Sequence, residues 1–279
     1  MKKLIKILIL VILCGTVFLV VTNPLNILRK HKEYLTPNDL FPYSEGEKIH
    51  FVNDKGSTLT LSVIKEEKKN NGRYLKINAL KGDLVLKEYD INILGNKINI
   101  KDKVPEIKGI DLREFIRSNN LTSFLFIYDC DFRITEEIQK GERQKEISEN
   151  TVFVWDIGGF ERITIGQRKE LICLKIVENY YFQRWITTPW GVHWWAPGLG
   201  LVRWDHYKER HLGGTPLLIS RWKVDWESLA KGERIKRYES IIKSIPKRRI
   251  QEYTRPRQES FSYDTFLKKR DQNQMSKEE

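Results

Sequence analysis

The sequence lacks the motifs by which many enzymes and nucleic-acid-binding proteins are identified. Its 279 residues contain three cysteines, with no CxxC spacing and no histidine at zinc-finger distance, which argues against a structural zinc site. No GxSxG nucleophile elbow and no GxxxxGK phosphate loop occur. No helix-turn-helix or RNA-binding motif accompanies the net charge of +12. We therefore expect no cofactor, no metal and no nucleic-acid partner, and we assign no catalytic residue.

The longest apolar run lies at the N-terminus. Residues 1–22 read MKKLIKILILVILCGTVFLVVT, and residues 4–22 are predicted to enter a membrane because their apolar length of about 18 residues approaches the ~20 that a bilayer needs. An A-x-A cleavage site is absent, and Leu13 before Cys14 does not fit a lipobox, so an uncleaved anchor is favoured over a cleaved signal. The basic leader predicts a cytoplasmic N-terminus and an extracytoplasmic body, with secretion after cleavage as the alternative.

The body shows the short alternating patterns of a mainly β protein. About a dozen β-branched segments, from residue 50 to residue 224, are separated by Asn, Asp and Gly turns, with a charged loop or hairpin extension at 136–149. One such turn, Gly158–Gly159, is expected to separate a strand at 151–157 from a strand at 160–165. One helix is expected in the first half, at 111–119. This pattern predicts a curved antiparallel sheet, as a half-barrel or a sandwich, between the N-terminal membrane helix and a C-terminal helix. The predicted parts are an anchor at 1–22, a linker at 23–42, the β domain at 43–228, a basic helix at 229–246 and a disordered tail at 247–279.

Basic residues are concentrated near the C-terminus. From Lys231 to Arg249, eight Lys or Arg stand against two Glu, which is +6 of the total +12. Pro246 is expected to end the helix. These charges could meet anionic lipid, wall polymer or a protein partner, or could form the solvated face of a helix packed on the sheet. The residues concerned are Arg234, Lys236, Arg237, Lys243, Lys247, Arg248 and Arg249.

Seven of the eight tryptophans lie within 42 positions, between residues 185 and 226. Neighbouring strand residues point to opposite faces, so at least one of Trp194 and Trp195 is expected to point away from the core or to cover an edge. The density indicates either an aromatic contact surface for a glycan, lipid or protein, or a tryptophan-rich core. The rings assigned to the contact surface are Trp185, Trp190, Trp194, Trp195 and Trp204.

Two smaller groups have alternative interpretations. His193, His206 and His211 with Asp205 could form a metal or acid–base cluster, but their spacing does not enforce convergence, and exposed histidines are the simpler interpretation. Cys130 and Cys173 lie in strand-like segments and could form one disulfide in an exported domain, or remain two buried thiols.

Three segments carry a resemblance to a known family. WWAPGLGLVR at 194–203, LFPYSEGEKIHFV at 40–52 and KELICLKIVE at 169–178 resemble, in order and spacing, segments of TapB-like exported bacterial β-sheet proteins, relatives of lipoprotein-carrier-like half-barrels. The resemblance covers about residues 40–225. It implies a curved antiparallel sheet with an envelope function, and it transfers no catalytic residue.

These patterns predict a membrane-anchored extracytoplasmic protein that binds a lipid, glycan or envelope protein. The alternatives are an interaction subunit that uses the basic helix and, third, a metal-dependent envelope enzyme. The sequence does not indicate the oligomeric state.

Overall fold

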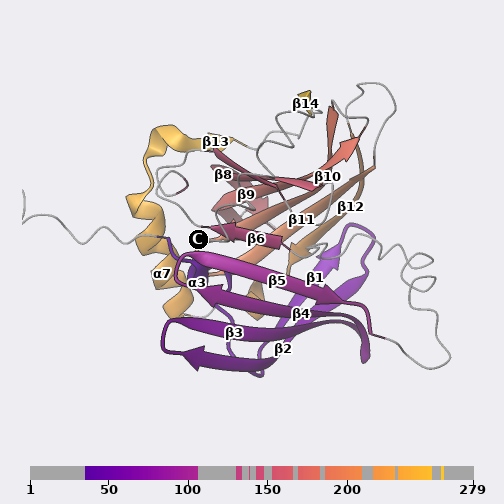
Figure 1. The fold of residues 1–279 in the computed structure, drawn as a ribbon, viewed down its shortest axis with the longest axis vertical. Helices are drawn as coiled ribbons and strands as arrows, with labels where there is room; N and C mark the ends of the chain where they lie inside the picture. Colours follow the sequence, from indigo (N-terminus) through magenta and orange to yellow (C-terminus); the bar gives the residue numbers. More distant parts are fainter. Residues whose placement is uncertain are drawn as a thin grey trace, which may run out of the picture. The chain divides into compact units, whose positions relative to one another are not determined.

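One large β-sheet organises the chain from residue 35 onward (Figure 1). The computed structural model describes residues 35–105, 130–133, 138, 143–147, 153–165, 169–182, 186–208, 216–229, 232–252 and 259–260. Its elements are α3 (Pro37–Leu40), β1 (Lys48–Asn53), β2 (Thr58–Lys69), β3 (Gly72–Lys81), β4 (Leu84–Leu94), β5 (Lys97–Lys103), β6 (Cys130–Arg133), β7 (Arg143–Ile147), β8 (Phe153–Ile165), β9 (Lys169–Phe182), β10 (Ile186–Ala196), β11 (Gly200–Lys208), β12 (Leu217–Val224), α6 (Trp226–Leu229), α7 (Gly232–Ser244), η1 (Lys247–Arg249), β13 (Ile250–Glu252) and β14 (Glu259–Ser260).

The sheet consists of two meanders that share a border. Strands β1 to β5 pair in sequence order, as do β8 to β12, and β12 pairs with β1. Within the described residues the sheet has 14 strands, and its path from β13 to β6 does not close. All pairs are antiparallel except β13 with β8. The predicted mainly β, antiparallel architecture is confirmed at this level.

Because side chains alternate along each strand, aliphatic and aromatic side chains lie together on one face of the sheet and form a core there. In β1 the buried and exposed residues alternate strictly, and Ile49 and Phe51 are both 0% exposed. In β2 to β5 the residues that continue this face through the strand registers are also buried. Each such side chain contributes about 1.5–3 kcal/mol on burial. We call this the interior face; in β2–β5 it includes Leu59, Leu61, Ile77, Tyr89, Ile91 and Ile100.

Part of the predicted linker belongs to the folded body. Leu40 and Phe41 are 0% and 2% exposed, and Thr36 forms a capping box with Asp39 at the start of α3. The Tyr43 hydroxyl accepts a hydrogen bond of 2.8 Å from the backbone N–H of Leu201. Residues 35–42 are therefore fixed on the β10–β11 hairpin instead of leading loosely into the domain.

Several predicted boundaries differ from the observed ones. The Gly158–Gly159 pair does not separate two strands, because β8 runs through it with a bulge between Ile157 and Phe160, and Gly159 has a φ of +85°. β7 lies in the segment 136–149, predicted as a charged loop or a hairpin extension, and its antiparallel pairing with β8 agrees with the second alternative. The start of the predicted tail, 247–252, forms η1 and β13. The helix expected at 111–119 lies outside the described residues.

The C-terminal helix agrees closely with the prediction. α7 spans Gly232–Ser244, and the chain turns away before Pro246, which cannot donate a helical hydrogen bond. Its apolar side packs on the sheet through Ile241, which is 1% exposed, and the Tyr238 hydroxyl accepts a hydrogen bond from the N–H of Ile172. Among the described residues, no helix has the length and hydropathy to cross a membrane; the predicted anchor lies outside them.

Candidate functional site

A polar group lies on the interior face where β9, β10 and β11 meet. The registers place Glu178 opposite Gly191 and His193 opposite Trp204. Since residues two apart on a strand share a face, Gly191 brings Glu178 and His193 to the same side. Glu178 and Trp204 are 0% exposed, and His193 is 1% exposed. Strand pairing alone therefore gathers a carboxyl, an imidazole and an indole inside the molecule.

Gly191 makes room for this gathering. A Cβ at Gly191 would lie 2.5 Å from Glu178 Oε2, 3.2 Å from Trp204 Nε1 and 3.4 Å from His193 Nε2. Three polar atoms from three strands thus converge over one glycine. Any larger residue here would have to displace the carboxyl group.

Glu178 and His193 lie in close contact, and His193 lowers the pKa of Glu178. Glu178 Oε2 lies 3.2 Å from His193 Nε2, and the imidazole stacks on the Trp204 ring with centroids 5.1 Å apart at 17°. Within the described part of the chain, both carboxyl oxygens of Glu178 and both ring nitrogens of His193 lack a hydrogen-bond partner. Buried polar atoms nearly always have such a partner, so this pair requires an explanation beyond packing.

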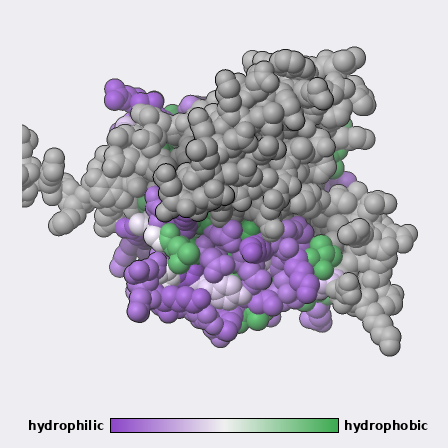
Figure 2. Space-filling view, viewed as in Figure 1, coloured by the Kyte–Doolittle hydropathy of each residue, from purple (hydrophilic) through white to green (hydrophobic). Residues whose placement is uncertain are grey.

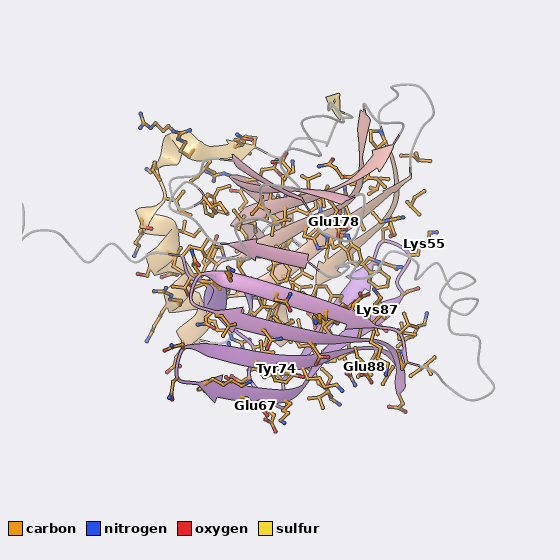
Figure 3. All side chains as sticks on the ribbon, in the orientation of Figure 1. Lys55, Glu67, Tyr74, Lys87, Glu88 and Glu178 are labelled. Atoms are coloured by element: carbon orange, nitrogen blue, oxygen red, sulfur yellow. The ribbon has the colours of Figure 1, made fainter. Side chains whose placement is uncertain are left out.

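A second charged pair reaches the same interior from the other meander. Lys87 of β4 forms an ion pair with Asp102 of β5, and the two side chains are 9% and 15% exposed. Figure 3 labels Lys87 on β4 and Glu178 among the strands of the second meander. Both members of the pair act on Glu178: Lys87 lowers its pKa and Asp102 raises it. We call Glu178, His193, Lys87 and Asp102 the interior polar cluster.

Burial dominates the electrostatics of this cluster. Loss of solvent raises the pKa of Glu178, and the neighbouring His193 and Lys87 offset only part of that effect. The pKa of Tyr89, whose register partner is Asp102, lies well above its ordinary value because of burial and the nearby carboxylates. Burial of this kind favours the protonated carboxyl group or its pairing with a cationic partner.

The tryptophans do not form an exposed aromatic surface where they are described. Trp194 and Trp204 are 0% exposed and Trp195 is 3% exposed, so the core alternative applies to these three rings. The exposed large hydrophobic residues of the described chain are all aliphatic and scattered: Val52, Ile64, Leu94, Val104 and Leu217. Figure 2 shows a mostly hydrophilic surface around β2 to β5 with isolated hydrophobic spots. Trp185 and the Trp190 side chain lie outside what the structure describes.

Trp194 and Trp195 can both be buried because both faces of this meander are covered. The Trp195 ring packs on Phe41, with centroids 4.8 Å apart, while Trp194 faces the opposite side and donates a hydrogen bond of 2.9 Å to Glu161. The alternation was predicted correctly. The expectation that one ring points away from the core or covers an edge was wrong, because it assumed a sheet with one solvated face.

The histidine cluster does not assemble. Asp205 and His206 are neighbours on β11 and therefore point to opposite faces. Asp205 instead binds Arg203 and Arg221, with distances from Asp205 Oδ1 of 2.9 Å to Arg203 Nε and 3.0 Å to Arg221 Nε. His211 lies outside the described residues. Among the described residues, no three His, Cys, Asp or Glu side chains could hold a metal together.

Two arginines of the basic helix form ion pairs within the chain. Arg234 forms an ion pair with Glu47, and Arg237 donates to Asp39 at 2.8 Å. On the exposed side of α7, Lys236 and Lys243 are balanced by Glu233 and Glu239. Lys247 and Arg248 follow as exposed charges, and Arg249 is half-buried. The strong basic face that the composition indicated is therefore reduced to the residues after Pro246.

Cys173 has a free thiol that is 0% exposed. Burial raises the pKa of this thiol well above its ordinary value, which keeps it protonated. The Cys130 side chain is not among those described. Of the two alternatives predicted for Cys173, a disulfide or a buried thiol, the structure has the buried thiol.

Sequence reasoning found His193 but missed Glu178, Lys87 and Asp102. The available signal was Glu178 itself, a lone acid in the apolar stretch LICLKIVENYYF of β9. Lys87 and Asp102 lie in strands that alternate with polar residues, so nothing local marks them as interior. Their meeting with Glu178 depends on the pairing of distant strands.

Comparison with known proteins gives weak matches. No protein-family model and no curated protein matches the chain. A predicted exported protein of Bacteroides fragilis with a YmcC-like fold is 15% identical, with a TM-score of 0.39 over 68% of this chain and 97% of that one. A predicted lipoprotein of Parabacteroides distasonis is 14% identical, with a TM-score of 0.31 over 68% of this chain and 96% of its own. Neither match is specific to TapB-like proteins, so that resemblance stays a prediction.

Proposed function

We propose that this chain is a membrane-anchored, extracytoplasmic binding or envelope-assembly protein that holds its ligand on the interior face of the sheet. Residues 1–22 support the anchor, and their basic leader supports the orientation. The ligand is a lipid, a glycan or a segment of an envelope protein. The observation that carries the proposal is the buried Glu178–His193 pair, whose polar atoms have no hydrogen-bond partner in the described chain.

A purely structural role would give these atoms partners. Desolvating an unpaired polar group costs about 1–3 kcal/mol, and more for a charged one. Elsewhere in the same meander the cost is avoided: buried Glu161 binds Lys175 at 2.6 Å and accepts the Trp194 N–H at 2.9 Å. A cluster that departs from this rule is typical of sites where a bound group supplies the missing contacts.

The two other functional classes receive less support from the geometry. The interaction-subunit alternative depended on a basic helix, yet Arg234 and Arg237 bind Glu47 and Asp39 of the same chain. The metal-dependent enzyme required His193, His206 and Asp205 to converge, and strand alternation separates Asp205 from the other two.

The Glu178→Gln variant should lose the ligand that copurifies with the wild-type protein. The full chain is extracted from its envelope in mild detergent, and the retained lipids, glycans and peptides are identified by mass spectrometry. We expect about tenfold less ligand with Glu178→Gln, since a hydrogen bond to a charged group contributes about 1.5–3 kcal/mol. Glu88→Gln is the matched control, because Glu88 lies on β4 and forms a partly exposed pair with Lys76. Equal retention by all three proteins would contradict the proposal.

A further inference from the structure

With His193 neutral, the interior polar cluster is short of one positive charge. When ionised, Glu178 and Asp102 each carry one negative charge, while Lys87 carries one positive charge and is already bound to Asp102. His193 is the closest group to Glu178, and as a neutral imidazole it adds an acceptor nitrogen but no charge. The cluster therefore offers three acceptor atoms around one uncompensated acid.

The acceptors and the charge of this arrangement are complementary to a primary ammonium group. An ammonium has three N–H donors and one positive charge, and charge-assisted hydrogen bonds to a carboxylate are about twice as strong as neutral ones. We infer that Glu178 and His193 bind the ammonium group of an amine-bearing ligand, with both Glu178 oxygens and one His193 nitrogen as acceptors. The inference rests on the proposed function and names the chemical class of its ligand.

Neighbouring groups favour an amine over an anion or a neutral alcohol. A carboxylate or phosphate would face Glu178 and Asp102 and would find Lys87 already paired. A neutral hydroxyl has one donor and would leave most of the acceptors without a partner. The Trp204 ring, stacked on His193, adds a polarizable wall of the kind that attracts cations.

Binding should release a proton. Burial raises the pKa of the Glu178 carboxyl, and any proton that it holds must leave before the carboxylate can pair with the ammonium. The ammonium stabilises the carboxylate, so the Glu178 proton leaves to solvent and an ion pair remains. The other groups that act on Glu178, Lys87 and Asp102, remain paired with each other, and the pKa of Tyr89 lies too high for it to ionise. Affinity should therefore rise with pH until the amine itself loses its proton near pH ~10.

Calorimetric titration of the full chain in detergent tests the inference. The probes are hexylammonium chloride, hexanol and sodium hexanoate, which share one alkyl chain. We expect hexylammonium to bind about tenfold or more tightly than the other two, since a single charge-assisted contact gives a factor of this size. Its affinity should increase from pH 6 to pH 8, and the measured enthalpy should vary with the buffer as one proton is released.

Variants distinguish this site from adventitious binding. Glu178→Gln should reduce the affinity for hexylammonium about tenfold or more, and Glu88→Gln should leave it unchanged. Gly191→Ala places a methyl group 2.5 Å from Glu178 Oε2 and should also weaken binding, which provides a second variant if Glu178→Gln does not fold. Equal affinity for the three probes, no saturable binding, or binding that is insensitive to both variants would overturn the inference. The copurification experiment would still report on the proposed function, because it detects a ligand of any class.

Discussion

The Asp205→Ala variant should lower the free energy of unfolding by about 3–5 kcal/mol, because it leaves buried arginine without its counter-charge. Asp205 is 0% exposed and pairs with two guanidinium groups, Arg203 and Arg221. Arg203 is 5% exposed and stacks over the Trp194 ring, with its guanidinium carbon 4.4 Å from the ring centroid. It cannot reach water without disturbing that stack.

Urea unfolding of the purified variant, followed by tryptophan fluorescence, measures this loss. Asp205→Asn is the graded control: it keeps one acceptor oxygen and the volume of the side chain, so its loss should be smaller. The two losses separate the missing charge from the missing volume. A change below about 1 kcal/mol for Asp205→Ala would show that the ion-pair network does not stabilise the fold.

Gly200→Ala should destabilise the protein by about 2–5 kcal/mol, as the sum of backbone strain and a steric clash. Gly200 has a φ of +98°, which residues with a Cβ rarely adopt. A Cβ there would overlap the Tyr43 hydroxyl and lie 2.5 Å from Tyr43 Cζ. Tyr43 is 0% exposed and accepts the Leu201 N–H, so its ring has little freedom to move.

Gly56→Ala separates the two contributions. Gly56 has a φ of +79°, and a Cβ built there meets nothing within 4 Å. This control should therefore lose only the strain contribution, about 1 kcal/mol. If chemical denaturation gives equal losses for the two variants, the contact between Tyr43 and the β10–β11 hairpin does not contribute to stability.

The sequence predicted which strands and helices exist better than it predicted where each one begins and ends. The 2-residue alternation in β1 to β5 and the Asn, Asp and Gly turns locate those strands, and α7 follows from its apolar spacing and Pro246. The bulge at Gly158–Gly159 was missed because a Gly-Gly pair is as typical of a turn as of a bulge. At 136–149 the structure agrees with the hairpin alternative, since the charged residues of β7 gain their order from pairing with β8.

The candidate site was harder to predict than the fold. Alternation shows that Trp194 and Trp195 face opposite sides, but it does not show which sides are covered. In β8 to β11 both faces are covered, so apolar density no longer separates inside from outside. Glu178 becomes informative only when the register places it over Gly191, and Lys87 only when β4 approaches from the other meander. These strand pairings bring together residues that are distant in sequence, and a single sequence does not show which distant strands pair.

The central claim is that Glu178 and His193 form a binding site and not a structural pair. In free protein such a pair costs stability, so replacing it by apolar residues of similar volume should be neutral or stabilising. Glu161 and Lys175 provide the contrast: their side chains are 2% and 13% exposed and are bonded to each other, and Glu161 also accepts the Trp194 N–H. Their apolar replacement would leave that indole without its acceptor.

The most direct measurement compares the free energies of unfolding of two double variants with that of the wild-type protein. Glu178→Met with His193→Leu should be unchanged or up to about 3 kcal/mol more stable, and should retain no ligand. Glu161→Leu with Lys175→Met should be less stable by about 1–3 kcal/mol. If the first double variant instead lost about 3 kcal/mol and kept its ligand, the pair would be structural and the proposed binding site would be wrong.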